Sequence, residues 1–252
     1  MLVKKSIILK GEGVIDYNYH YELMKRIYEA LTLSDNKRAI KLHNEGILSN
    51  GKKFKLFNYT LAFDKNVSYL ENGISFNKDN HIKLIISGDD KILNSIIKGI
   101  ILKGKIKLNE YELKVIELEN DKDIKFNNIM LYKVRSPIVE SIYEDGVKYT
   151  SPYTKEWYSA LANNLKRKYK AVYNEEYDKE IFFDIEDILN IKKKMITKIK
   201  KGFVIGYTDF EIFIEADPKM QKIAYYLGLG QNSSIGMGAI SYIKGWKNGQ
   251  DI

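Results

Sequence analysis

The residue with the clearest potential for acid–base chemistry is His43, one of three histidines in a chain without cysteine. Ser34 or Asp35 can cap a short helix that runs through His43, and Gly46 follows as its stop. A histidine at the C-terminal end of a helix lies at the negative end of the helix dipole, which stabilises imidazolium. Such a group suits general acid catalysis. A histidine that only caps helix carbonyls is the ordinary alternative, and on the residues alone we prefer it.

The other histidines and the acidic residues do not suggest a second centre. His20 is predicted on the first turn of a helix among tyrosines, as an amphipathic surface position, and His81 as an edge residue at the start of a strand. A metal-dependent nuclease would need carboxylates and histidines that converge on the ion. The acidic residues within 175–187 have no histidine near them in sequence. We therefore predict no metal site and no cofactor.

Positive charge is clustered in the second half of the chain. Lysines are dense between residues 192 and 201, and Lys166 and Arg167 lie in a second basic segment at 166–170. The whole chain has 41 Lys+Arg against 33 Asp+Glu, which gives a net charge of +8. Clustered positive charge is typical of proteins that bind a polyphosphate. A solvated lysine-rich surface explains the charge equally well.

The most informative segment is GLGQNSSIGMG, residues 228–238. Glycines and serines leave its backbone amides free to turn toward an anion. The segment follows a predicted helix and precedes a strand, whereas dinucleotide-binding and P-loop glycines follow a strand and open a helix. Helix–strand connections usually have only about 2–6 residues. We therefore favour contact with a phosphate backbone over a merely flexible connection.

The elements that must position these residues follow one order twice. In the first half we predict strands at 3–10, 54–63, 82–87 and 106–118, and helices at 19–31 and 91–102. In the second half we predict a strand at 129–134, a hairpin around 145–146, a helix at 154–169, a hairpin from 193–200 and 203–215, a helix after Asp217-Pro218, and a strand at 237–243.

Both halves therefore have the order β-α-β-β-α-β. This order predicts an α+β protein of two tandem ferredoxin-like (split βαβ, RRM-like) domains with antiparallel sheets, covering residues 1–122 and 123–252. We expect helices on one face of each sheet and an open face opposite, a platform related to that of RNA-recognition motifs. The N-terminal domain would carry His43 and the C-terminal domain the glycine-rich segment.

Three segments together resemble one protein family. The loop GLGQNSSIGMGAI before the last strand is similar to the glycine-rich signature of the RAMP superfamily of CRISPR proteins. Residues 40–46 (IKLHNEG) with 54–59 (FKLFNY), and residues 151–169, which end in NLKRKY, are similar to motifs of its repeat-RNA (pre-crRNA) processing endoribonucleases. The chain is thus identified as a member of that family, and the resemblance spans nearly all of it. It implies that the protein cuts CRISPR repeat RNA to make guide RNAs.

The resemblance also implies a mechanism and a set of catalytic residues. The RNA 2′-hydroxyl attacks the adjacent phosphate without metal, which gives 2′,3′-cyclic phosphate and 5′-hydroxyl ends. The family often pairs the histidine with a tyrosine on the preceding helix, here Tyr28, and with a lysine after the histidine. Among Lys52, Lys53 and Lys55 we choose Lys52, with Lys53 close behind, to stabilise the phosphate. If Tyr28 is buried, the site reduces to histidine plus lysine.

The expected partner is CRISPR repeat RNA, as precursor and as processed guide. The predicted RNA-binding residues are Lys53, Lys166, Arg167, Lys192, Lys193, Lys194, Gly228, Gly230, Gln231, Asn232, Ser233, Ser234, Gly236 and Gly238. Assembly into a CRISPR effector complex and a homodimer stay open. The alternative functions are a non-catalytic RNA-binding RAMP subunit and an unrelated ferredoxin-like binding module. The chain has no signal-peptide pattern and no apolar run of membrane-spanning length, so we expect a cytoplasmic protein.

Overall fold

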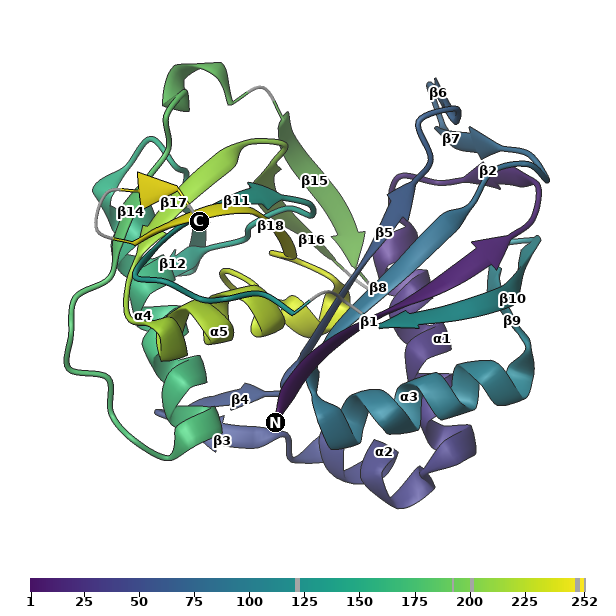
Figure 1. The fold of residues 1–252 in the computed structure, drawn as a ribbon, viewed down its shortest axis with the longest axis horizontal. Helices are drawn as coiled ribbons and strands as arrows, with labels where there is room; N and C mark the ends of the chain where they lie inside the picture. The colour runs from purple at the N-terminus through teal and green to yellow at the C-terminus, as the bar shows by residue number, and fades with distance from the viewer. Residues whose placement is uncertain (121–122, 192, 200–201, 248–249, 252) are drawn as a thin grey trace.

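The computed structural model describes residues 1–252 apart from 121–122, 192, 200–201, 248–249 and 252, and shows two α+β halves side by side (Figure 1). The first half contains an antiparallel sheet with the strand order β5-β8-β1-β10-β9, and the second contains one with the order β14-β17-β11-β18-β19. These orders confirm the predicted tandem ferredoxin-like class. The boundary proposed at 122/123 lies between the sheets, and residue 122 is outside the described residues.

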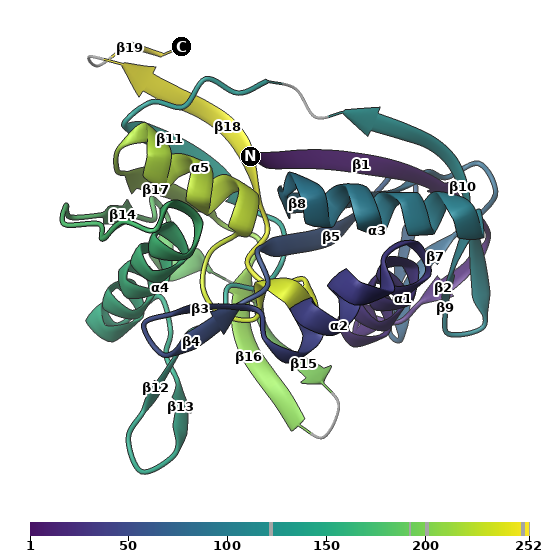
Figure 2. The same cartoon turned by 90° about the horizontal axis from the view of Figure 1, so that it is seen from below.

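The first half is built from helices α1 (Tyr19–Ser34), α2 (Asn36–Asn44) and α3 (Asp90–Lys103). Its strands are β1 (Leu2–Lys10), β2 (Gly13–Ile15), β3 (Ile47–Ser49), β4 (Lys52–Phe54), β5 (Phe57–Phe63), β6 (Ser68–Leu70), β7 (Gly73–Phe76), β8 (Ile82–Asp89), β9 (Lys105–Leu108) and β10 (Tyr111–Asn120). Helices α1 and α3 cover one face of the sheet (Figure 2). They approach closely at Gly99, where a Cβ would lie 1.8 Å from the carbonyl oxygen of Ala30.

The second half is built from α4 (Lys155–Tyr173) and α5 (Pro218–Leu227), with short 3-10 turns η1 (Ile188–Asn190) and η2 (Ser233–Ile235). Its strands are β11 (Ile129–Val134), β12 (Ser141–Tyr143), β13 (Val147–Tyr149), β14 (Phe182–Asp184), β15 (Lys193–Ile199), β16 (Gly202–Thr208), β17 (Glu211–Glu215), β18 (Ile240–Lys247) and β19 (Gln250–Asp251). The glycine-rich segment connects α5 to β18 and contains η2.

The predicted helix starts are confirmed because they depend on local capping. The Asp35 carboxylate accepts a hydrogen bond from the amide of Arg38 at the start of α2. The Asp217 carboxylate does the same for Met220 at the start of α5, where Pro218 occupies the first turn. Helix α2 therefore begins where expected and ends at Asn44, directly after His43.

Three predicted strands are interrupted, each at a residue with positive φ. The strand predicted at 54–63 breaks between β4 and β5 at Leu56, whose φ is 49°. Asn109, with φ 53°, divides the strand predicted at 106–118 into the hairpin β9–β10. Asp209, with φ 69°, divides 203–215 into β16, which pairs with β15, and β17, which joins the main sheet. The last strand begins at Ile240, because Gly236 and Gly238 keep left-handed conformations before it.

The prediction of an open sheet face is wrong at β5. The strand is buried on both faces, because its second face packs against the glycine-rich segment and α5 of the other half. There the side-chain amide of Asn58 donates a hydrogen bond of 3.0 Å to the carbonyl of Met237. The two halves therefore share a packed interface centred on β5.

Candidate active site and RNA interface

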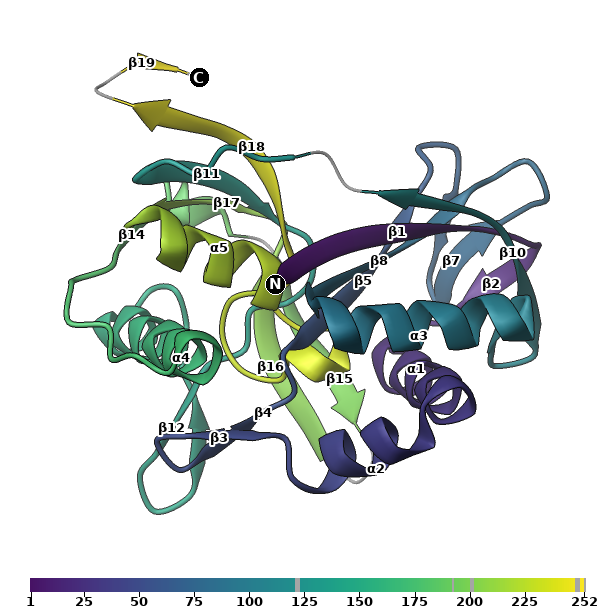
Figure 3. The same ribbon diagram turned by 60° about the horizontal axis from the view of Figure 1, so that its bottom comes forward.

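A hairpin of the first half carries the candidate lysines to the second half. Strands β3 and β4 pair around Asn50 and Gly51, whose φ values of 44° and 74° are those of a tight two-residue turn. The hairpin extends across to α4 (Figures 2 and 3). The Ser49 hydroxyl donates to the carbonyl of Arg167 at 2.9 Å, and the Lys170 ammonium donates to the Asn50 side chain at 2.9 Å. Contacts from α4 thus fix the hairpin.

His43 is exposed at the C-terminal end of α2 and lies among aromatic and cationic side chains. Its imidazole packs edge-on against the ring of Tyr28, with 5.9 Å between centroids, and its Nδ1 lies 3.0 Å from the Asn44 side-chain oxygen. The ammonium of Lys55 lies 4.9 Å from the centre of the Tyr28 ring. His43, Tyr28 and Lys55 line one cavity of about 890 Å³. An exposed imidazole beside a cation can donate a proton and help to stabilise a phosphate at one place.

Tyr28 contributes its ring to this cavity, whereas its hydroxyl is buried. The hydroxyl has no hydrogen-bond partner among the described residues, and burial raises the pKa of Tyr28. The ring also packs against Phe57 of the core, with 6.2 Å between centroids. Of His43, Tyr28 and Lys55, only the histidine and the lysine therefore offer a polar group to a ligand in this cavity, while Tyr28 supports the imidazole ring.

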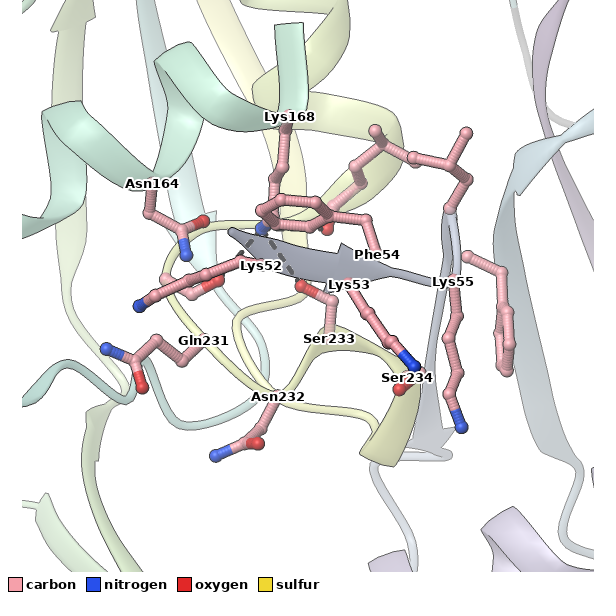
Figure 4. Close-up of a pocket in the computed structure, with 14 residues that line it drawn as sticks. Lys52, Lys53, Phe54, Lys55, Asn164, Lys168, Gln231, Asn232, Ser233 and Ser234 are labelled. Carbon is pink, nitrogen blue, oxygen red and sulfur yellow. Dashed lines mark hydrogen bonds between the residues drawn. The ribbon is translucent and has the colours of Figure 1, made fainter. Parts of the chain in front are cut away.

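The structure brings Lys55 and Lys53 toward the histidine, and it does not bring Lys52. The break at Leu56 ends the strand pattern in which successive side chains of β4 point to opposite faces. Lys55 lies half-buried over Tyr28, and burial lowers the pKa of Lys55. The Lys53 ammonium donates to the carbonyl of Asn44 at 3.0 Å, next to His43. Lys52 instead lines a second cavity, between β4, α4 and the glycine-rich segment (Figure 4). The lysine that lies over the Tyr28 ring is thus one that the sequence did not single out.

The glycine-rich segment is held in place by a buried lysine. The Lys168 side chain is buried, and its ammonium donates to the carbonyls of Gly228 and Gly230 at 2.8 Å each, to the carbonyl of Leu227 at 3.3 Å and to the Ser233 hydroxyl at 2.9 Å. Burial lowers the pKa of Lys168 to about 7, while the nearby Glu140 raises it. Four oxygen acceptors favour the charged form. Within the basic segment 166–170, Lys168 is therefore not available at the surface.

Glu140 is a second buried ionisable group beneath the segment. Its Oε2 accepts a hydrogen bond of 3.0 Å from the Gln231 side chain, and its Oε1 has no partner among the described residues. Burial raises the pKa of Glu140 to about 7, against the opposing effects of the Gln231 hydrogen bond and the Lys168 charge. The carboxyl group and the ammonium together hold residues 227–233, the part of the segment that faces the second cavity.

The four glycines of the segment pack against the protein's own atoms. Each has positive φ, and added Cβ atoms would lie 2.0 Å from the Asn58 amide nitrogen at Gly228, 2.6 Å from the Val139 carbonyl at Gly230, 2.6 Å from the Tyr59 ring at Gly236 and 1.7 Å from the Leu229 carbonyl at Gly238. Internal packing is therefore sufficient to require glycine. The half-buried tip Gln231–Ile235 is the part that can reach a ligand.

His20 does not lie at the surface as predicted. It is 2% exposed, its ring stacks on Tyr19 with 4.3 Å between centroids, and its Nδ1 has no partner among the described residues. Burial lowers the pKa of His20 to about 4. The histidine lies where η2 packs on the first half, since a Cβ on Gly236 would be 3.0 Å from its Nδ1. His81 is exposed before β8 and lies 3.5 Å from the Asp64 carboxylate.

The other predicted RNA-binding residues lie on α4 and on β15. Lys166 and Arg167 are half-buried on α4, and Lys193 and Lys194 begin β15, whereas Lys192 lies outside the described residues. The β15–β16 hairpin reaches the first half, where the amide of Lys198 donates to the Asn18 side chain at 3.1 Å. In the part of the chain that the structure describes, no three His, Asp or Glu side chains group as metal ligands. None of the helices in the described residues is long and apolar enough to span a bilayer.

Sequence models of one family match both halves of the chain. The model described as CRISPR-associated protein Cas6, N-terminal, matches residues 14–119, and the model described as CRISPR associated protein Cas6, C-terminal, matches residues 119–242. The chain belongs to the Cas6 family. This membership confirms the resemblance seen in the sequence.

Individual Cas6 proteins are similar over most of the chain. A CRISPR-associated endoribonuclease Cas6 1 of Methanocaldococcus jannaschii is 28% identical over 239 residues, which are 90% of this chain and 87% of the relative. A CRISPR-associated endoribonuclease Cas6 of Pyrococcus furiosus is 25% identical over 90% of this chain and 83% of its own. A solved structure described as CRISPR associated protein Cas6 has a TM-score of 0.77 and 27% identity, covering 96% of this chain and all 100% of that chain. The names of the relatives confirm the predicted enzyme class, endoribonuclease.

Proposed function

We propose that this chain is a metal-independent endoribonuclease that cuts CRISPR repeat RNA, with His43 as the general acid. The observation that carries the proposal is the cavity in which His43, at the free end of α2, lies beside Tyr28 and Lys55. Family membership and the names of the relatives support repeat RNA as the substrate.

The reaction needs a proton donor for the leaving oxygen and positive charge near the phosphate. The RNA 2′-hydroxyl loses its proton to solvent water and its oxygen attacks the adjacent phosphorus, a 2′,3′-cyclic phosphate forms, and the bond to the 5′-oxygen breaks. His43 as imidazolium gives its proton to that 5′-oxygen, which leaves as a hydroxyl. Lys55, with Lys53 close to Asn44, stabilises the negative charge on the phosphoryl oxygens. These roles require that the scissile phosphate lie at the mouth of the His43 cavity.

A cleavage assay with modified substrates tests this proposal. End-labelled repeat RNA from the organism's own CRISPR array is incubated with the protein in excess chelator, and the product ends are analysed. We expect cutting at one position, with cyclic phosphate and 5′-hydroxyl ends. RNA with a single 2′-deoxynucleotide at that position should bind and stay intact.

Two outcomes would contradict the mechanism. Cutting of the 2′-deoxy substrate at the normal rate would exclude attack by the 2′-hydroxyl, and loss of cutting in chelator would indicate a metal-dependent reaction. Tight binding of repeat RNA without any cutting would instead favour the alternative of a non-catalytic RNA-binding subunit.

A further inference from the structure

A second cavity adjoins the one that contains His43, and the reaction proposed above does not use it. It has a volume of about 340 Å³ and lies between β4, α4 and the tip of the glycine-rich segment (Figure 4). This volume is near the lower end of the roughly 300–1,000 Å³ range of small-ligand pockets. Lys55 lines both cavities, so a ligand in one lies within reach of groups in the other.

Asn164 gives this cavity an unused hydrogen-bonding group. The side chain is 3% exposed and lines the cavity from α4, and its Oδ1 has no hydrogen-bond partner among the described residues. A buried acceptor without a donor is unfavourable, and such groups in native proteins are usually satisfied by a ligand or by water. The Asn164 side chain is therefore oriented for a partner that enters the cavity.

The rest of the lining combines three kinds of group that together match a nucleotide. Asn164 presents a carboxamide, whose adjacent donor and acceptor can pair with the edge of a base, whereas the Gln231 carboxamide is already bonded to Glu140 and Ser141. Phe54 supplies an aromatic ring on which a base can stack. Lys52 is an exposed cation at the same cavity, available to a phosphate. An inorganic anion would use the lysine alone and leave the aromatic ring and the Asn164 amide without a role.

The cavity wall is fixed before any ligand binds. Lys168 holds the carbonyls of Gly228 and Gly230 and the hydroxyl of Ser233, and Glu140 holds Gln231. Since these contacts already order the segment, binding does not have to bear that entropy cost. A preformed pocket of this kind can select one chemical shape.

We propose that this cavity binds one unpaired nucleobase of the RNA substrate, from a nucleotide next to the scissile phosphate. Phe54 stacks on the base, the Asn164 carboxamide hydrogen-bonds its edge, and Lys52 contacts the flanking phosphate. The proposal rests on the proposed function and makes it more specific: the pocket recognises a base, whereas His43 acts on the phosphate. The shared Lys55 places the bound nucleotide beside the cleaved bond.

Abasic RNA tests the pocket. A series of repeat RNAs, each made uncleavable by 2′-deoxy at the scissile position, carries a single abasic nucleotide at each successive position around the cut. Dissociation constants are measured for wild type, Phe54→Leu and Asn164→Leu, with Phe182→Leu as the matched control. Phe182 is an exposed aromatic residue on β14 that lines neither cavity. Unchanged melting temperatures verify folding.

One abasic position close to the cut should weaken binding by wild type and by Phe182→Leu by about tenfold, a typical effect of losing one stacked base. Phe54→Leu and Asn164→Leu should bind intact RNA less tightly and lose most of that abasic penalty. An equal abasic penalty in all four proteins, or no penalty at any position near the cut, would refute base binding in this cavity. Normal cleavage of intact RNA by wild type would in that case leave the proposed function in place. Failure of wild type to bind or cut any repeat RNA would refute both.

Discussion

Replacing Lys168 by methionine tests the idea that one buried ammonium holds the glycine-rich segment. Methionine has a similar length and apolar stem but no donor, so the carbonyls of Gly228 and Gly230 and the hydroxyl of Ser233 lose their shared partner. Each buried acceptor left unpaired costs roughly 1–3 kcal/mol. The wild-type protein, however, bears the cost of burying the Lys168 charge, and the methionine variant does not, so the net loss of stability is smaller than the sum. We expect the free energy of unfolding to fall by about 3–5 kcal/mol, the lower part of the sum for these acceptors.

The assay for Lys168→Met is urea unfolding followed by fluorescence, with Lys166→Met as the control two residues earlier on the same helix. Lys166 is only half-buried, and its ammonium lies 5.9 Å from the Tyr177 ring centre, so its loss should cost less than about 1 kcal/mol. RNA affinity should also fall in Lys168→Met, because the segment no longer keeps its shape. A Lys168→Met protein as stable as Lys166→Met would refute the holding role. The segment would then be fixed by glycine packing alone.

Three more predictions concern the catalytic and ionisable groups. His43→Ala should lower the single-turnover cleavage rate by about 10²-fold or more and change the dissociation constant only a few-fold, whereas His81→Ala should change neither. A wild-type rate in His43→Ala would exclude His43 as the acid. Lys55→Met should lower that rate by about 10²-fold and Lys52→Met only a few-fold, and the reverse order would restore Lys52 as the catalytic lysine. Because the pKa of Glu140 is raised to about 7, its stabilising contribution is complete below its ordinary pKa of 4.5 and is lost as pH rises through about 7. Urea unfolding should therefore show that Glu140→Gln gains stability over wild type between about pH 5 and pH 8, by at most about 3 kcal/mol, and parallel pH profiles would contradict this.

The features that the sequence predicted are those set by neighbouring residues. Asp35 and Asp217 cap helices through amides three residues ahead, so the helix that ends beside His43 could be found without a structure. The order of elements follows from such local signals and from hydrophobic periodicity. The hairpin at Asn50-Gly51 was missed, although Asn-Gly is the strongest short-range signal for a two-residue hairpin turn.

The features that the sequence did not predict depend on contacts between the halves. His20 and Lys168 have residue types that usually lie at the surface, and they are buried because α1 and α4 meet the glycine-rich segment. The choice among three lysines depends on the break at Leu56 and on the docking of the hairpin on α4. The docking joins residues 118 positions apart, so no local pattern along the chain encodes it.

The β3–β4 hairpin has a consequence for how such sites change during evolution. His43 and Lys55 lie at the open end of the hairpin, where Ile47 pairs with Phe54, while the turn at Asn50-Gly51 lies at the other end. Inserting or deleting four residues at the turn adds or removes two pairs, so the two-residue turn follows the same kind of pair and every pair at the open end is kept. The number of residues between histidine and lysine can therefore change in steps of four without moving either side chain. A search for this histidine–lysine pair by fixed spacing would overlook homologues that a search by hairpin register would find.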